Sequence, residues 1–555
     1  MKGTVVAGAL GNCVHVAGVV HFLREAEALG YEPVFLGAAV PVEDFVAAIR
    51  RHRPSIVGVS YRLTPEVASL LFDAFDAAIG NAFTSAERGN MRLMFGGTPP
   101  VCEVARRTGI FTHCFDGLEH PQAVRAALGG LSGRKTAAMT EDSLAARIGA
   151  AAGYPLLRHH VGLPTLESTV EAVETIARAG VLDIVSLAPD QNAQESFFRP
   201  EQMDPRLDGA GGVPVRSRED LLRIKEATRQ GNHPLVRIYS GTRDLLQWAA
   251  LSEETLRNAW GAVPLCWYNA LDGRSPRSPA ASIAENQTAM RWYGERGLPL
   301  EVNEAHHWSL RDAHDTIAVA AAWLAAWNAK RAGVRLYVSQ YMLNTPPTTS
   351  PAMDLAKMAA KIELVESLHD ESFTTLRQTR AGLLHLSPRM RVAKGQLAAS
   401  TMLALQLKPQ IVHVVGYCEG DHAAGAEDVI ESCEIVQGVI RNCLDGQPDF
   451  MADPAVAARK HLLVQEARLL LDAIRGLGEG TADPLSDPDV LARAIGLGLL
   501  DAPHLKGNPH AAGQLETRCV DGAIHAWHRE TGAILPESRR IGMILDSGKR
   551  VADAG

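Results

Sequence analysis

Two kinds of apolar pattern alternate along the chain. Short apolar runs that end in glycine or a small polar residue predict buried strands, and longer segments with apolar positions three and four apart predict helices. In the first 130 residues the predicted strands are 5–10, 33–36, 55–59 and 91–95, and the predicted helices include 16–29 and 42–51. This alternation is typical of an open, doubly wound α/β sheet.

The same alternation continues from residue 163 to residue 443. The predicted strands there are 183–187, 235–239, 263–268, 300–303, 335–340 and 411–415, with helical segments between them. Strand–helix units repeated over this length predict a (β/α)8 TIM barrel.

The chain is therefore expected to contain two α/β domains and a smaller third part. Residues 131–150 begin in a stretch rich in Gly and Ser, which predicts a linker. The expected boundaries are 1–130 for the doubly wound domain, 151–450 for the barrel and 451–555 for a helical and irregular C-terminal lobe.

Composition and charge exclude several classes of protein. The 555 residues carry a formal net charge of -8 without a basic run, which argues against a nucleic-acid partner. No apolar stretch approaches the roughly 20 residues of a membrane span, and the N-terminus shows no signal-peptide pattern. The eight cysteines form no Cys-x-x-Cys pair, which fits reduced thiols. These features predict a cytoplasmic protein with no nucleic-acid or membrane partner. We also expect a homodimer that acts on a small molecule.

The loop after the first predicted strand carries a candidate metal ligand. His15 lies between a strand that ends at Leu10 and a helix, at the edge where open α/β sheets bind ligands. Ser60, Gly96 and Gly97 follow two later strands at the same edge. Small residues there leave room for a large ligand close to the backbone.

This pattern, His15-x-x-Gly18 with Ser60 and Gly96-Gly97, resembles the cobalamin-binding domain of base-off/His-on enzymes such as glutamate mutase and methionine synthase. The resemblance implies a flavodoxin-like domain in which His15 binds cobalt from below and the Ser and Gly-Gly line the channel for the nucleotide tail. The family motif is Asp-x-His-x-x-Gly, and Cys13 occupies the Asp position. Because a thiol is a weak, normally uncharged donor, we expect a differently tuned bond between His15 and cobalt.

Polar residues follow the predicted strands of the barrel, where barrel enzymes place their reactive groups. They are Asp190, Gln191, Asn192, Arg237, Tyr239, Tyr268, Asn269, Asn303, Glu304, His306, His307, Gln340, Tyr341, Asn344, Tyr417 and Glu419. The densest group is residues 303–307. Its spacing matches no zinc motif, and a position just past a strand suits substrate hydrogen bonding.

The order of elements in this region resembles the large, barrel-forming subunit of glutamate mutase (methylaspartate mutase). The whole chain looks like the two subunits of that enzyme fused, with the cobalamin domain first. The resemblance implies that Arg237 holds a substrate carboxylate, that Tyr268 and Asn269 lie beside the substrate, and that Glu419 binds the adenosyl ribose.

Departures from glutamate mutase predict a different substrate. His160 and Gln194 stand where two of its three substrate arginines are expected, and neither reproduces the bidentate fork with which Arg binds a carboxylate. A dicarboxylate held as glutamate is held is therefore not expected. Lysine 5,6-aminomutase is a more distant resemblance. No lysine lies between Lys2 and Lys135 to form its Schiff base, so no pyridoxal phosphate is expected.

These residues predict an enzyme, an adenosylcobalamin-dependent radical isomerase of the carbon-skeleton mutase type. Arg237, Tyr268, Asn269, Glu304 and His306 are expected to hold the substrate. Two alternatives stay open. One is a corrinoid methyltransferase, although no Cys cluster for a zinc–thiolate site is visible, and the other is a non-catalytic corrinoid carrier or sensor.

Overall fold

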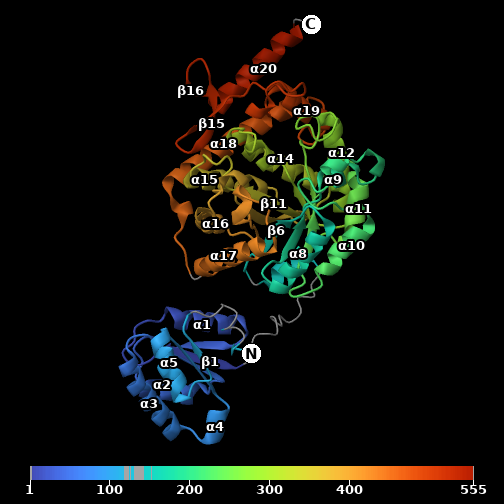
Figure 1. Ribbon diagram of the computed structural model, residues 1–555. Coiled ribbons are helices and arrows are strands. Elements are labelled where there is room, and N and C mark those ends of the chain that lie inside the picture. Colours follow the sequence, from blue (N-terminus) through green and yellow to red (C-terminus); the bar gives the residue numbers. More distant parts are fainter. Residues whose placement is uncertain are drawn as a thin grey trace. The chain divides into compact units, whose positions relative to one another are not determined.

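The computed structural model describes residues 3–117, 124, 127–129, 143–151, 153–239, 241–444 and 446–553. The chain divides into two compact units, Met1–Ala137 and Ala138–Gly555 (Figure 1). Residues 130–142, the larger part of the expected linker, lie outside the described residues. In the described part of the chain, no helix is both long enough and apolar enough to span a bilayer.

The first unit is a parallel sheet with helices on both faces (Figure 1). Its strands are β1 (Thr4–Ala9), β2 (Glu32–Phe35), β3 (Ile56–Tyr61), β4 (Arg92–Gly97) and β5 (His113–Phe115). Their spatial order is β2-β1-β3-β4-β5, the flavodoxin-like order, whose switch point lies between β1 and β3. The predicted doubly wound fold is confirmed.

Apolar side chains attach the helices of this unit to the sheet. The helices are α1 (Ala17–Ala28), α2 (Val42–His52), α3 (Pro65–Ala82), α4 (Ser85–Gly89) and α5 (Pro99–Thr108). α2, α3 and α5 pack on one face, where Phe72 and Phe75 are fully buried. α1 packs on the other face through Phe22 and Leu23. The space between α1 and the carboxyl ends of the central strands is left open.

The second unit is built on eight parallel strands that form a nearly closed barrel. They are β6 (Leu156–Val161), β7 (Ile184–Leu187), β8 (Leu235–Ile238), β9 (Gly261–Val263), β10 (Leu300–Val302), β11 (Leu336–Met342), β12 (Thr374–Arg380) and β13 (Ile411–His413). The ladder runs β8-β7-β6-β13-β12-β11-β10-β9, and it is interrupted between β8 and β9. At this seam the Ala259 N–H donates to the Val236 carbonyl at 2.8 Å.

Two of the barrel strands, β6 and β12, are not predicted by the apolar pattern. Their sequences, Leu-Leu-Arg-His-His-Val and Thr-Thr-Leu-Arg-Gln-Thr-Arg, place charged and polar side chains inside a strand. The prediction for β9 is displaced, because β9 ends at Val263. Pro264 follows and has no N–H to offer the ladder.

Helices surround the barrel (Figure 1). They are α7 (Leu144–Ala150), α8 (Leu166–Ala179), α9 (Gln191–Ser196), α10 (Arg218–Ala227), α11 (Leu245–Leu256), α12 (Pro279–Glu295), α13 (Ala305–Ser309), α14 (Asp315–Arg331), α15 (Pro351–Glu366), α16 (Met390–Leu405) and α17 (Ala426–Leu444). α14 is buried around most of its circumference because further helices cover it.

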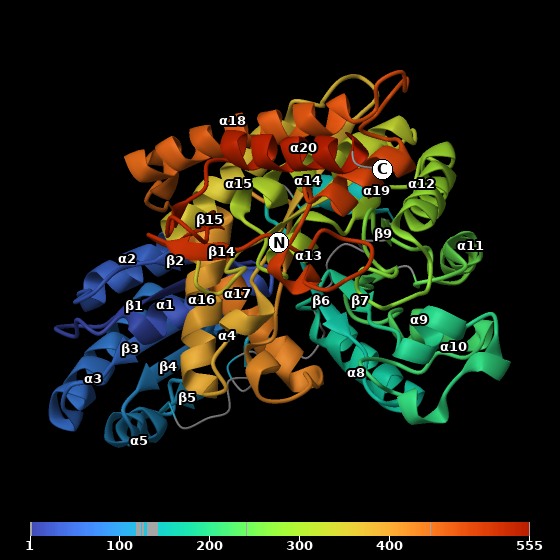
Figure 2. The ribbon, with the colours of Figure 1, turned by 90° about the horizontal axis from the view of Figure 1, so that it is seen from above.

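The C-terminal segment packs on this helical layer. It contains α18 (Pro454–Gly476), α19 (Pro488–Leu497), α20 (Glu537–Asp553) and an antiparallel sheet of β14 (Thr517–Val520), β15 (Ala523–His528) and β16 (Ala533–Ile534). α18 lies against α14 and α15, and α20 lies along α18 (Figure 2). Leu463 of α18 and Leu491 of α19 belong to the same apolar cluster as Ile317 of α14, so this segment shares the barrel's outer core.

Candidate functional site

A cavity of about 440 Å³ lies between α1 and the carboxyl ends of the central strands in the first unit. Gly18, Ser60, Gly96 and Gly97 all line it. A Cβ added at Gly18 or Gly96 would meet no protein atom within 4 Å, so these glycines border open volume. A Cβ at Gly97 would lie 2.6 Å from the Tyr61 carbonyl oxygen, so only glycine fits the packing of β4 on β3.

His15 is exposed on the loop between β1 and α1. Its Nδ1 lies 3.8 Å from the buried Cys13 Sγ, a weak hydrogen bond, and Nε2 has no partner among the residues that the structure describes. The loop itself is fixed, because the Cys13 carbonyl accepts from the Ala39 N–H at 2.8 Å. The imidazole therefore presents a free nitrogen that can bind a metal.

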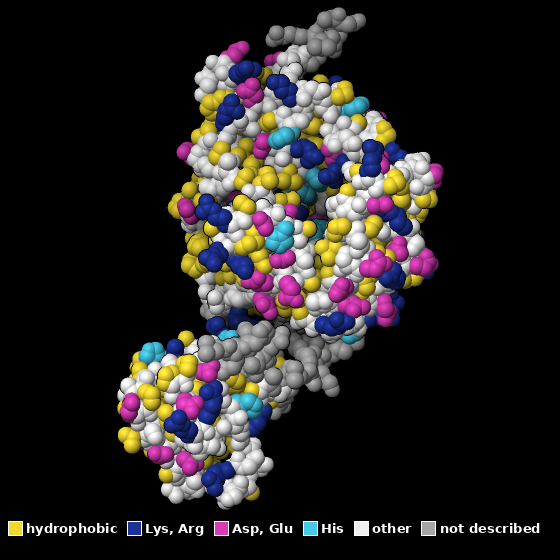
Figure 3. Space-filling model, viewed as in Figure 1, with side chains coloured by type: hydrophobic (Ala, Val, Ile, Leu, Met, Phe, Trp, Pro, Cys, Tyr) yellow, Lys and Arg dark blue, Asp and Glu magenta, His cyan; other side chains and the backbone are white. Residues whose placement is uncertain are grey.

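The barrel holds a larger cavity of about 810 Å³ at the carboxyl side of its strands. Lys, Arg and His side chains lie in and beside the hollow of this unit in the space-filling view (Figure 3). The polar residues that line the cavity are Arg158, His160, Gln191, Gln194, Glu195, Arg237, Tyr239, Thr242, Tyr268, Asp272, Arg274, Glu301, Asn303, His306, His307, Gln340 and Arg380. This position is the usual one for a barrel active site.

One buried carboxylate in the cavity is shared by two arginines. Glu301 Oε2 lies 3.1 Å from Arg237 Nη2 and 3.6 Å from Arg158 Nη1. The Trp260 indole N–H donates to the same oxygen at 2.8 Å. Burial opposes ionisation of Glu301, but Arg237 and Arg158 outweigh it and hold the pKa of this carboxyl below its ordinary value.

Arg380, the last residue of β12, has no comparable partner. Its side chain forms no hydrogen bond or ion pair within the described part of the chain, and its Nε is buried and unpaired. The charges of Glu419 and Glu301 act on it only at longer range. Buried guanidinium groups therefore outnumber the carboxylates that pair with them, which favours an anionic ligand.

The histidines of the cavity are neutral at pH 7. Burial lowers the pKa of His306 to about 3, and the charge of Arg380 adds to the effect. Burial likewise holds the pKa values of His160 and His307 far below the usual range. Gln340 Nε2 lies 3.1 Å from His306 Nδ1. These imidazoles offer hydrogen bonds without charge.

Three of the five residues predicted to hold substrate line this cavity. They are Arg237, Tyr268 and His306, which come from β8, the segment after β9 and the segment after β10. Tyr268 adopts a left-handed backbone conformation with φ +67°, and the Arg274 guanidinium lies 4.4 Å from the centre of its ring. The structure thus brings together three residues that are spread over positions 237–306 of the sequence.

Asn269 and Glu304 do not line the cavity. The Asn269 side-chain amide donates to the Cys266 carbonyl at 2.9 Å. The Glu304 carboxylate accepts from the backbone N–H groups of Leu265 and Cys266 at 3.1 and 2.9 Å and from the Trp308 indole at 2.7 Å. Both side chains hold the segment after β9, which forms one wall of the cavity.

Replacing Glu304 with alanine is expected to lower the free energy of unfolding by roughly 3 kcal/mol, because it leaves buried N–H donors without an acceptor. Urea unfolding would measure this change. Glu304→Gln keeps an acceptor oxygen and should cost less. The exposed Glu427 supplies the control, Glu427→Ala. A loss for Glu304→Ala no larger than that of the control would contradict this role.

Glu419 lies in the turn η4 (Tyr417–Gly420) after β13. It is exposed and does not line the cavity. Its charge nevertheless acts on Arg380, so the two side chains share the carboxyl edge of neighbouring strands.

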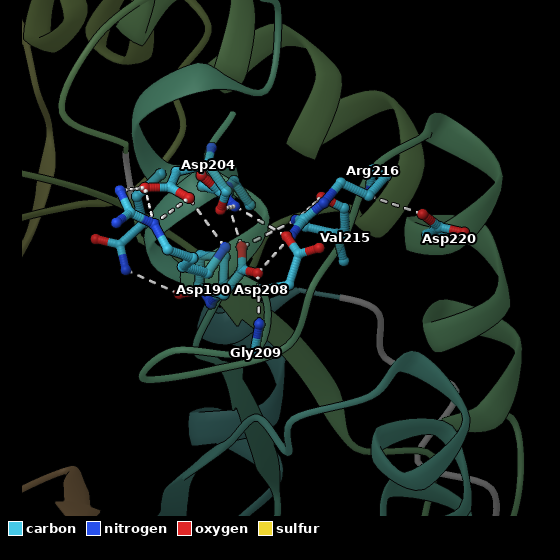
Figure 4. Close-up of polar contacts among 12 residues, drawn as sticks. Asp190, Asp204, Asp208, Gly209, Val215, Arg216 and Asp220 are labelled. Atoms are coloured by element: carbon cyan, nitrogen blue, oxygen red, sulfur yellow. Dashed lines mark hydrogen bonds and ion pairs between the residues drawn. The ribbon is translucent and has the colours of Figure 1, made fainter. Parts of the chain in front are cut away.

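Asp190, which follows β7, supports the cavity wall from behind. Its fully buried carboxylate accepts from both Nη atoms of Arg216 at 2.9 and 2.6 Å and from the Gly209 N–H at 2.9 Å (Figure 4). It also caps α9, because it accepts from the Ala193 N–H at 2.8 Å. Asp190 therefore positions the helix that brings two glutamines to the cavity.

Stability is expected to fall as pH falls from 7 to 5. Burial lowers the pKa of His159 to about 4 and of His306 to about 3, and it lowers those of His160, His307 and His413 as well. The unfolded chain, with ordinary values near 6.5, binds these protons first, so each histidine removes about 1.4 kcal/mol per pH unit below that value. Urea unfolding at several pH values would measure the slope, and a constant stability would contradict it.

Comparison with known proteins identifies the first unit. Residues 3–123 match the family described as the B12 binding domain. The first unit is a B12-binding domain. The predicted cobalamin-binding module is thereby confirmed at the level of the domain, and the barrel follows it in the same chain.

Three solved structures resemble parts of the chain. A cobalamin-binding protein from Desulfitobacterium hafniense DCB-2 is 25% identical over 23% of this chain with a TM-score of 0.20, and this chain spans only 60% of its length. A Rubisco-like protein from Rhodopseudomonas palustris is 10% identical over 60% of this chain and 73% of its own, with a TM-score of 0.32. The cobalamin-dependent S-adenosylmethionine radical enzyme OxsB is 9% identical over 88% and 70%, with a TM-score of 0.17. TM-scores this low are no basis for assigning an activity.

Proposed function

We propose that the protein is a cobalamin-dependent radical isomerase of the carbon-skeleton mutase type, related to glutamate mutase, that uses adenosylcobalamin and acts on a small carboxylate-bearing substrate. The observation that carries the proposal is a B12-binding domain joined to a barrel whose cavity has a surplus of buried guanidinium groups. When bound, adenosylcobalamin supplies a carbon radical that abstracts hydrogen from a substrate.

His15 is the proposed cobalt ligand in the first unit. Its exposed imidazole has a free Nε2, and imidazole is a suitable ligand for cobalt. Gly18, Ser60 and Gly96 border open volume that fits the nucleotide tail of the cofactor. Cys13, at 3.8 Å, orients the imidazole more weakly than a carboxylate would, so we propose a less basic ligand than the family motif provides.

The arginines of the barrel cavity are the proposed carboxylate-binding groups. The Arg380 side chain is half-buried and has no hydrogen-bond or ion-pair partner among the described residues, and the two buried guanidinium groups of Arg158 and Arg237 share the single carboxylate of Glu301. These guanidinium groups line the cavity, where a carboxylate substrate would bind them through bidentate contacts. Tyr268 and neutral His306 complete the lining and add no competing charge.

The remaining predicted site residues take supporting roles in this proposal. Asn269 and Glu304 position the cavity wall through the contacts described above. Glu419 stays the proposed contact to the adenosyl ribose, at the carboxyl edge beside Arg380. A corrinoid carrier would have no use for two buried guanidinium groups that share one carboxylate, because the second charge costs free energy in the ligand-free protein.

The test combines an absorbance spectrum, which measures cofactor binding, with isotope exchange, which measures the radical step. The full chain is reconstituted with adenosylcobalamin tritiated at the 5′ carbon and incubated with small carboxylates and with their amides. We expect tritium to enter at least one carboxylate and none of the amides. Cofactor binding without exchange would refute the radical step. Methyl transfer from methylcobalamin, with no exchange from adenosylcobalamin, would establish the methyltransferase alternative.

A further inference from the structure

A group of three different metal-ligating side chains lies at the start of α17, outside the lining of both cavities. It consists of Cys418, His422 and Asp428. One sulfur, one imidazole nitrogen and one carboxylate oxygen from these residues lie within 4.8 Å of one another. Neither the cobalamin domain nor the proposed substrate contacts account for this grouping.

The backbone places the three side chains on one side. The His422 N–H donates to the Cys418 carbonyl at 3.0 Å, the spacing of one helical turn, so residues four apart project in the same direction. Asp428 lies in the first turn of α17. Its Oδ2 accepts from the Gly425 N–H at 3.0 Å, and its Oδ1 accepts from the Tyr417 hydroxyl at 3.0 Å. The carboxylate is therefore fixed before any ion arrives.

The two nitrogens of His422 have different surroundings. Nδ1 lies 2.8 Å from Asp421 Oδ2, and Nε2 lies 3.3 Å from Asp428 Oδ2. A histidine that binds a metal usually donates its other ring N–H to a carboxylate, as Nδ1 can to Asp421. Nε2 then presents a lone pair toward a carboxylate oxygen, and either a proton or a metal ion must lie between these two acceptors.

We propose that Cys418, His422 and Asp428 bind a zinc ion. Thiolate, imidazole and carboxylate are the ligands that zinc prefers, and they match neither magnesium nor calcium. The ligand atoms of a tetrahedral zinc site lie about 3.3 to 3.8 Å apart, so small rotations of these side chains complete the site. Three protein ligands leave the fourth position for water. The bound ion ties the turn η4, which carries Glu419, to α17.

Metal binding to the full chain tests the proposal. The protein is treated with a chelator, dialysed against zinc and analysed for metal, and cadmium is then used as an optical probe of thiolate ligation. We expect one ion per chain and a thiolate-to-cadmium absorption band. Cys418→Ser and His422→Ala should each weaken zinc binding at least tenfold. Cys443→Ser, on α17 but outside the group, is the matched control and should bind as the parent protein does.

Two outcomes would overturn the zinc site. One is a parent protein that binds no zinc, in which case His422 is an imidazolium paired with Asp421 and Asp428. The other is zinc binding that Cys418→Ser and His422→Ala leave unchanged. Asp428→Asn retains an oxygen acceptor for the turn, and circular dichroism identifies any variant that fails to fold. None of these variants alters His15 or Arg380, so the outcome is independent of the proposed isomerase activity.

Discussion

Replacing His15 with alanine is expected to weaken cobalamin binding by roughly tenfold or more and to remove the spectral signature of a histidine bound to cobalt. The expectation rests on the exposed imidazole, whose Nε2 is free for a metal. Absorbance titration of the full chain with adenosylcobalamin would give both the affinity and the ligation state. His52→Ala, in the last turn of α2, is the control histidine of the same unit.

The Cys13 position provides an independent variant. Cys13→Asp should strengthen the bond between His15 and cobalt, because a carboxylate orients the imidazole and raises its basicity more than a thiol at 3.8 Å does. An unchanged affinity and spectrum in His15→Ala would remove His15 from the cofactor site. The match of residues 3–123 to the B12 binding domain would then require another ligation mode.

Replacing Arg380 with glutamine is expected to lower kcat/KM for the carboxylate substrate about a hundredfold, which is the loss of one charge-assisted contact of roughly 3 kcal/mol. Arg380→Lys keeps the charge but not the planar fork, so its kcat/KM should lie between those of the parent protein and of Arg380→Gln. Tritium exchange measured over a range of substrate concentrations would separate kcat from KM.

Stability measurements distinguish a substrate contact from a structural role. Arg380 has no partner in the described part of the chain, so Arg380→Gln should leave the free energy of unfolding unchanged or raise it. Arg391→Gln, at an exposed position of α16, is the matched control for loss of an arginine. Full activity in Arg380→Gln would refute its contact with the substrate.

Most of the fold follows from the apolar pattern, and the exceptions have one cause. Six barrel strands have apolar cores and were predictable, although β9 is displaced by Pro264. β6 and β12 point arginine, histidine and glutamine side chains into the barrel. Their sequences therefore lack the continuous apolar run by which a buried strand is predicted. Arg158 and Arg380 lie on these two strands, and therefore the sequence alone did not reveal them as cavity residues.

Position after a strand predicts where a residue lies but not which way its side chain turns. Arg237 and His306 face the cavity, whereas Glu304 turns back to accept backbone N–H groups. The direction of the Glu304 side chain depends on Pro264 and the short β9, because they leave nearby backbone N–H groups without a partner in the strand ladder. The cavity of the first unit was easier to predict, because small residues at the strand ends indicate room for a ligand, and Gly18 and Gly96 do border open volume.

The interruption between β8 and β9 separates the stability of the barrel from the shape of its cavity. The wall beside it carries Tyr268 and Arg274 and is anchored by Glu304, with no strand ladder to keep in register. Residues there can be exchanged without shifting the pairing of any strand. This wall is consequently the place where directed evolution should change substrate preference at the lowest cost to folding.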